Sequence, residues 1–137
     1  MIKFTVPLDW NLSKNRANKI STRGGKIRSY KNPLHKKLQD DIELLVKLEK
    51  NKIGWSPKKK KLWILISLFK KGNTGDVANL VDPLMDGIKK GLQLDDTWYA
   101  PLTDWTIVDQ EEQRVEIYIS YMLNELLEIL ISNNEVI

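Results

Sequence analysis

Residues 62–69, with the sequence LWILISLF, form the longest apolar run of the chain. Both alternating sets of positions are apolar except at Ser67, a pattern typical of a central strand that is covered on both faces of its sheet. The run is far too short to span a bilayer as a helix. It therefore predicts a sheet with this strand in its interior.

Other segments alternate in the manner of strands with one buried face. Residues 2–8 form one of them, and Pro7 suits an edge strand because proline cannot donate to a strand ladder. Residues 105–108 and 114–120 predict a hairpin connected by the polar sequence DQEEQ. The basic stretch 9–32 predicts a long loop or an irregular hairpin around the glycine pair GG.

Three helices follow from apolar spacing. The first spans residues 33–50, with a stripe made of Leu34, Leu38, Ile42, Leu45 and Leu48. The second spans residues 77–90 and is either kinked by Pro83 or begins there with Asp82 as its cap. The third spans residues 121–131, and its stripe of leucines is expected to be buried against the sheet or a second subunit.

The element order β-α-β-α-β-β-α predicts an α+β fold with a small mixed sheet and packed helices. At 137 residues we expect a single domain, residues 1–137, in which residues 120–137 form a C-terminal helical extension. The chain has no cysteine and one histidine, which argues against a zinc site and a Ser-His-Asp triad. We expect His35 on the surface, Trp63 in the core, no membrane role and a cytoplasmic location.

The charges divide sharply along the chain. Residues 1–75 contain 19 lysines and arginines against 5 acidic residues, whereas residues 76–137 contain 3 against 13. This asymmetry suggests that the first half faces a polyanion and the second half supplies carboxylates. The alternative is that folding interleaves the two halves so that their charges neutralise each other.

Most of the functional signal lies in residues 73–98, NTGDVANLVDPLMDGIKKGLQLDDTW, which contain Asp76, Asp82, Asp86, Asp95 and Asp96. At about 100° per helical residue, two of these share one polar face with Asn79. Each aspartate alone is explained as a cap or a solvated residue, but the set suggests a bound cation. Oxygen ligands without histidine or cysteine favour Mg²⁺ or Mn²⁺, and such a metal beside a basic surface is typical of phosphodiester hydrolysis.

These residues resemble the signature of RusA-type Holliday junction resolvases. The matching segments are GDVAN with Asp76 and Asn79, LMDGIKKGL with Asp86, and LQLDD with Asp95 and Asp96. The N-terminal FTVPLDWNLSKNRANK also resembles the family, with Ser13, Asn15 and Arg16 in its loop positions. In element order the resemblance covers roughly residues 2–119.

The resemblance implies a homodimeric, Mg²⁺-dependent endonuclease that nicks four-way DNA junctions in a bacterial or phage-infected cell. By position it makes Asp76 and Asp96 metal ligands, with Asp95 as a further ligand and Asp86 as a further catalytic candidate. Asn79 and Asp82 become supporting residues. It also implies a DNA-binding loop that contains Lys14, Asn15, Arg16, Lys19, Arg23, Lys26 and Arg28, for which the alternative is an ordinary solvated loop.

Two positions depart from the family pattern. Ala78 stands where the family has its second essential aspartate, and Asp82 stands where many members have a helix lysine. Either Asp82 or Asp86 restores the ligand count and a nearby lysine replaces the lost charge, or the protein binds junctions and cuts them poorly or not at all.

Three further questions stay open in the sequence. The lysines of residues 58–61 either follow a DNA backbone or only solubilise the strand entrance. Trp98 and Tyr99 either stack on an unpaired base or pack at a dimer contact. The helix 77–90 is about 21 Å long and the connector 91–96 spans at most about 20 Å, so a same-chain site helped by a bend is favoured over a site shared between subunits.

Overall fold

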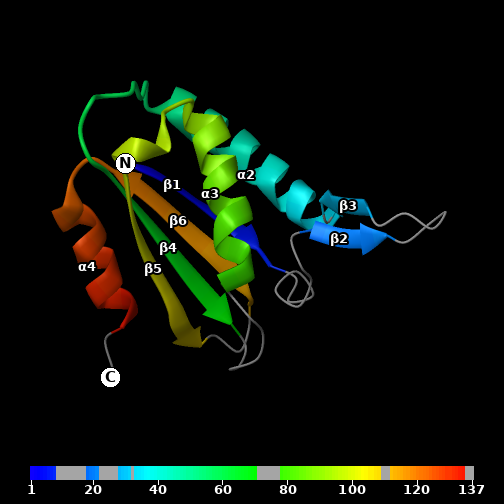
Figure 1. Ribbon diagram of the computed structural model, residues 1–137. Coiled ribbons are helices and arrows are strands. Elements are labelled where there is room, and N and C mark those ends of the chain that lie inside the picture. Colours follow the sequence, from blue (N-terminus) through cyan, green and yellow to red (C-terminus); the bar gives the residue numbers. More distant parts are fainter. Residues whose placement is uncertain (9–17, 22–27, 32, 71–77, 109–111, 135–137) are drawn as a thin grey trace.

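The computed structural model describes residues 1–8, 18–21, 28–31, 33–70, 78–108 and 112–134. The main sheet has four strands in the order β1 (Ile2–Pro7), β6 (Arg114–Ser120), β4 (Leu62–Lys70) and β5 (Tyr99–Val108) (Figure 1). The β4 strand lies inside the sheet, parallel to β5 and antiparallel to β6. Its residues from Ile64 to Phe69 are buried on both alternating sets, as its apolar pattern predicts. The β1 strand lies at one edge, which suits Pro7.

The predicted hairpin between residues 105–108 and 114–120 is wrong, because β4 lies between β5 and β6. The β5 strand begins earlier than expected, at Tyr99, and pairs with β4 from Leu62↔Tyr99 onward. A strand that follows another strand through a crossover helix normally lies parallel to it. The helix between β4 and β5 supplies this crossover, and β6 then occupies the other side of β4.

The α2 helix (Pro33–Lys52) and the α3 helix (Ala78–Leu92) lie side by side on one layer (Figure 1). They approach closely because Gly87 and Gly91, one turn apart on α3, face α2. A Cβ atom on Gly87 would lie 2.7 Å from the carbonyl oxygen of Gln39, and one on Gly91 would lie 2.5 Å from Cβ of Val46. The pair of glycines therefore sets the contact between the two helices.

Helix α3 runs through Pro83 without interruption, so the alternative start at Pro83 with Asp82 as cap is wrong. Asp76, which precedes this helix in the sequence, lies outside the described residues. Between β1 and α2, the β2 strand (Asn18–Ser21) pairs antiparallel with β3 (Arg28–Lys31). Of the two alternatives for the basic stretch, the structure therefore contains the hairpin.

The α4 helix (Leu123–Asn133) packs against β4 and β6. Of its apolar stripe, Leu126 is fully buried, whereas Leu127 and Ile131 are exposed. Burial against the chain's own sheet therefore accounts for only part of the stripe. No helix among the described residues is long and apolar enough to cross a membrane.

Several burial predictions need correction. His35 is fully buried instead of lying on the surface, because the buried side of α2 runs through His35, Leu38, Gln39, Ile42 and Val46. Consequently Leu34 and Leu48, predicted on the apolar stripe, are exposed. Trp63, predicted in the core, is only half-buried at the start of β4, where the lysine ammonium of Lys61 lies 5.2 Å from its ring centroid.

Candidate active site

The acidic pair Asp95 and Asp96 lies in a tight turn between α3 and β5. After α3, Gln93 adopts the left-handed conformation with a φ of 56°, which ends the helix. A short 3₁₀ turn, η2 (Asp96–Trp98), then leads directly into β5. We call residues 95–98 the acidic turn.

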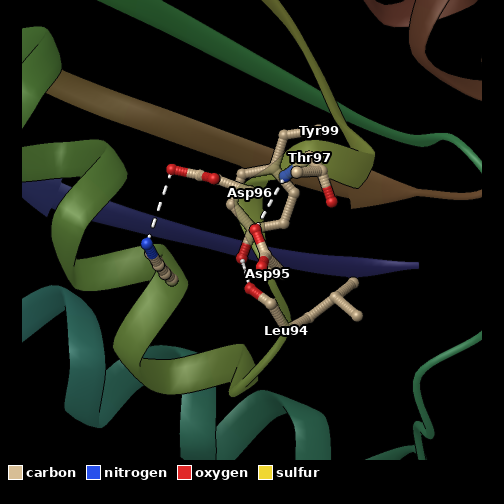
Figure 2. Close-up of polar contacts among 6 residues, drawn as sticks. Leu94, Asp95, Asp96, Thr97 and Tyr99 are labelled. Carbon is tan, nitrogen blue, oxygen red and sulfur yellow. Dashed lines mark hydrogen bonds and ion pairs between the residues drawn. The ribbon is translucent and has the colours of Figure 1, made fainter.

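Two hydrogen bonds hold the acidic turn in place (Figure 2). The Asp95 carboxylate caps η2, because its Oδ1 accepts a hydrogen bond of 3.1 Å from the amide nitrogen of Thr97. The Tyr99 hydroxyl donates a hydrogen bond of 2.8 Å to the carbonyl oxygen of Leu94. Burial, followed by the negative charges of Asp96 and Asp95, raises the pKa of Tyr99, so this donor keeps its proton.

The two carboxylates are exposed. The Thr97 amide, above all, holds the pKa of Asp95 below its usual range, and the charge of Lys89 acts in the same direction. The Lys89 ammonium nitrogen lies 3.5 Å from Oδ2 of Asp96, and both side chains are at least half exposed. The acidic turn therefore presents two negatively charged groups to solvent, with one cation beside them.

A groove runs along the end of α3 next to the acidic turn. It has a volume of about 730 Å³ and is lined by Gln39, Asp86, Lys89, Lys90, Gln93, Leu94 and Asp95. The structure thus brings together two of the predicted site residues, Asp86 and Asp95, in one groove. Asp96 joins them through its contact with Lys89, which also lines the groove.

The remaining predicted site residues are not gathered there. Asp76 lies outside the described residues, and Asn79 lies in the first turn of α3, where only the backbone is described. Asp82 is exposed on α3, one turn before Asp86. Within the described part of the chain, no three histidine or carboxylate side chains converge in a way that could hold a metal ion.

Only part of the predicted DNA-binding loop can be placed. Lys19 lies in β2 and Arg28 lies in β3, so the hairpin brings the two segments together. Figure 1 shows this hairpin near the start of α2 and away from the four-stranded sheet. The other predicted contacts lie outside the described residues, namely Lys14, Asn15, Arg16, Arg23 and Lys26.

Lys89 is the site residue that the sequence left unnamed. One alternative from the sequence was that a nearby lysine replaces the missing helix lysine, and Lys89 is the lysine that contacts Asp96. The available signal was its position seven residues before Asp96, but the turn at Gln93 that folds the acidic turn back toward Lys89 has no clear sequence pattern.

A turn with two exposed carboxylates beside a groove, in a chain with a basic first half, has the features of an enzyme that acts on nucleic acid. More specifically, the family description Endodeoxyribonuclease RusA matches residues 9–120 of the 137-residue chain. The chain therefore belongs to the RusA endodeoxyribonuclease family. Comparison with curated proteins found no match.

Proposed function

We propose that this protein is a homodimeric, Mg²⁺-dependent endonuclease that resolves four-way DNA junctions. Membership of the RusA family supports the substrate and the reaction. The observation that carries the proposal for this chain is the acidic turn, in which Asp95 and Asp96 are exposed and held by polar contacts at the edge of a groove.

The donor set fits the proposed metal. The carboxylates of the groove and turn, Asp86, Asp95 and Asp96, are oxygen ligands of the type that suits Mg²⁺ or, as a substitute, Mn²⁺. Within the described part of one chain they do not converge, so a further ligand must complete the site. When bound, the metal supplies an activated water and stabilises charge on the phosphate that is cut. The Thr97 amide keeps Asp95 oriented and charged, and Lys89 places a cation where a phosphate can bind.

The length of α3 bears on how the metal site is completed. From Ala78 to Lys89 the helix rises about 16 Å at about 1.5 Å per residue, and Asp96 lies beside Lys89. Asp76 is two residues before Ala78, and two residues of chain span at most about 7 Å. Ligands of one Mg²⁺ lie within about 4 Å of each other, because each is about 2.1 Å from the metal. In a same-chain site the side chains alone must bridge the roughly 9 Å that remain, whereas a shared site needs no such reach. We therefore propose a site shared between subunits, with the same-chain site that the sequence favoured as its alternative.

A twofold dimer with shared sites requires two antiparallel α3 helices, with the start of each beside the end of the other. The exposed side of α3 suits this arrangement because its charge changes sign along its length. Asp82 lies in the first part, Asp86 lies just past the middle, and Lys89 and Lys90 lie in the last turns. Antiparallel pairing places the acidic part of one helix opposite the basic part of the other.

Cleavage of a synthetic four-way junction tests the proposed reaction. Wild-type protein should nick it with Mg²⁺, whereas Asp76→Asn and Asp96→Asn should each abolish nicking and leave junction binding intact, because both remove a ligand without adding repulsion. Near wild-type cleavage by either variant contradicts the role of that residue. Binding without cleavage by the wild-type protein instead favours the second candidate, a junction-binding protein that cuts poorly, for which Ala78 is the motivating departure.

Subunit mixing tests the shared site separately. Asp76→Asn and Asp96→Asn proteins, each inactive alone, are exchanged into heterodimers. In a shared arrangement one site carries both defects and the other is intact, so nicking of one strand returns. If exchange is confirmed by mass-tagged subunits and nicking stays absent, each site is built within one chain.

A further inference from the structure

Two groups of lysines in the described part of the chain differ in their contacts. On α2, four lysines have a carboxylate partner on their own helix, in the pairs Lys36–Asp40, Lys37–Asp41, Lys47–Glu43 and Lys52–Glu49. In contrast, no carboxylate of the described residues lies within ion-pair distance of Lys58, Lys59, Lys60 or Lys61, and all four are exposed. We call these four residues the lysine segment.

Aromatic residues hold the lysine segment against the sheet. The backbone amide of Lys58 donates a hydrogen bond of 2.7 Å to the Tyr121 hydroxyl, which donates in turn to the Lys58 carbonyl oxygen at 3.3 Å. The Lys58 and Lys60 ammonium nitrogens lie 5.7 Å and 5.1 Å from the Tyr121 ring centroid. Trp55 stacks parallel to Tyr121 at a centroid distance of 6.0 Å.

The contacts with Tyr121 hold the positively charged lysine side chains close to one another. Adjacent ammonium groups repel one another, and a segment that served only solubility would gain nothing from a fixed backbone. The cation–π contacts offset part of the repulsion while leaving the charge in place. Glu125 also lines the cavity of about 250 Å³ beside Tyr121, but its carboxylate accepts a hydrogen bond of 2.8 Å from Ser120. The lysine segment therefore keeps its positive charge available to an outside anion.

The lysine segment and the acidic turn precede the first residues of two adjacent parallel strands, at the same end of the sheet. It leads directly into Leu62, the first residue of β4, and Leu62 pairs with Tyr99, the first residue of β5. The acidic turn directly precedes Tyr99, just as the lysine segment directly precedes Leu62. Because adjacent strands lie about 4.8 Å apart, the lysine segment and the carboxylates enter the sheet side by side.

We propose that the lysine segment is a phosphate-binding surface that holds the backbone of one DNA arm next to the acidic turn. This inference rests on the proposed endonuclease function and assigns a second DNA contact, separate from the β2–β3 hairpin. Lysines bind phosphates as point charges, so the surface adds affinity without base preference. Its place beside Asp95 and Asp96 brings the bound strand to the carboxylates, which otherwise repel a phosphate.

The salt dependence of DNA binding tests this surface. All proteins carry Asp96→Asn so that the DNA stays intact. One variant has Lys58, Lys59, Lys60 and Lys61 changed to Gln, and its matched control has Lys36, Lys37, Lys47 and Lys52 changed to Gln, so that both lose the same charge. Binding of a labelled four-way junction and of duplex DNA is measured over a range of salt concentrations.

Each lost phosphate contact flattens the slope of log K against log salt by about 0.9. We expect the lysine-segment variant to lose a slope of about 2 to 4 on both DNAs, with the control within about one contact of the parent. A third protein with Lys→Arg at all four positions should retain the parent slope, which excludes misfolding as the cause.

The possible negative results distinguish failure of the lysine-segment surface from failure of the proposed function. Equal flattening by the lysine-segment variant and its control would show a net-charge effect and overturn the assigned surface. An unchanged slope in the lysine-segment variant overturns it as well, while binding by the parent protein leaves the proposed function standing. If the parent itself binds neither DNA at low salt, the proposed function fails, and the inference fails with it.

Discussion

The ammonium nitrogen of Lys89 lies 3.5 Å from Oδ2 of Asp96, so one residue of α3 contacts a proposed metal ligand in the following turn. A unit charge about 5 Å from a divalent cation is unfavourable by roughly 2 kcal/mol in water before salt screening. Replacing Lys89 with Gln should therefore tighten Mn²⁺ binding a few-fold. Isothermal titration of Mn²⁺ into the protein measures this change.

The neighbouring residue supplies the control for this experiment. Lys90 is exposed on the same turn of α3 and has no carboxylate partner among the described residues. Lys90→Gln removes the same charge and should change Mn²⁺ affinity less than Lys89→Gln does. Equal effects, or weaker metal binding by Lys89→Gln, contradict a direct influence of Lys89 on the Asp96 site.

The antiparallel pairing of α3 predicts a charge-reversal pattern. Asp82→Lys and Lys90→Asp should each weaken the dimer about tenfold at low salt, because two symmetric exposed pairs contribute about 0.7 kcal/mol each. The double variant should recover most of the loss, because its charges are again complementary. Sedimentation equilibrium gives the dimer dissociation constants. If the two single effects simply add in the double variant, these residues do not face each other across the dimer.

The contact between α2 and α3 predicts unusual sensitivity at two glycines. Gly87→Ala places a Cβ atom 2.7 Å from the Gln39 carbonyl oxygen, and Gly91→Ala places one 2.5 Å from Cβ of Val46. Each should lower the free energy of unfolding by about 1–3 kcal/mol, although alanine favours the helix itself. Urea denaturation measures the loss.

Another glycine, Gly54, serves as a control, and a change at Val46 tests the contact directly. Gly54 has a φ of 62° and open space around its Cβ position, so Gly54→Ala should cost only about 1–2 kcal/mol of backbone strain. Val46→Ala should partly rescue Gly91→Ala, because it removes Cγ1, which lies 2.6 Å from the added Cβ atom. It should leave Gly87→Ala unimproved, because Gly87 faces Gln39 and Ile42. Stabilisation by Gly91→Ala alone would show that the helices can separate without penalty.

Tyr118 predicts a loss of stability at alkaline pH. Burial, assisted by the hydrogen bond of its hydroxyl to Glu116, raises the pKa of Tyr118 to about 12. The unfolded chain releases this proton near pH 10, so between about pH 10 and about pH 12 the folded state binds more protons and stability falls as pH rises. Tyr118→Phe should remove this contribution and flatten the decline. If the free energy of unfolding falls equally with pH in wild type and Tyr118→Phe above about pH 10, the raised pKa of Tyr118 is contradicted.

Local patterns predicted which elements form, but not all of their neighbours. The apolar run of β4 and the spacing in α2 and α3 determined their types and approximate bounds. Period-two alternation identifies a strand without specifying its partner, which is why the predicted β5–β6 hairpin was wrong. His35 is buried because the side of α2 that packs against the rest of the protein is rotated relative to the predicted leucine stripe.

The candidate site was predictable to a similar degree. The sequence placed Asp86 on the polar face of this helix and Asp95 after the end of the helix, and the groove contains both. The left-handed Gln93 is less accessible to sequence reasoning, because glutamine has no special preference for that conformation. The role of the lysine segment was also undecided in the sequence, since ion pairing and aromatic contacts come from the folded structure.

The uninterrupted passage of α3 through Pro83 has a consequence for the substrate. In the proposed dimer the two metal centres lie at opposite ends of the paired α3 helices, so their separation follows the helix length, about 22 Å for 15 residues. That distance spans about six nucleotides of a stacked strand at about 3.4 Å per nucleotide. Adding one turn to α3 moves the centres apart by about 5.4 Å and leaves each one chemically unchanged. In the proposed dimer the length of α3 would therefore determine which two phosphates of a branched DNA are cut as a pair.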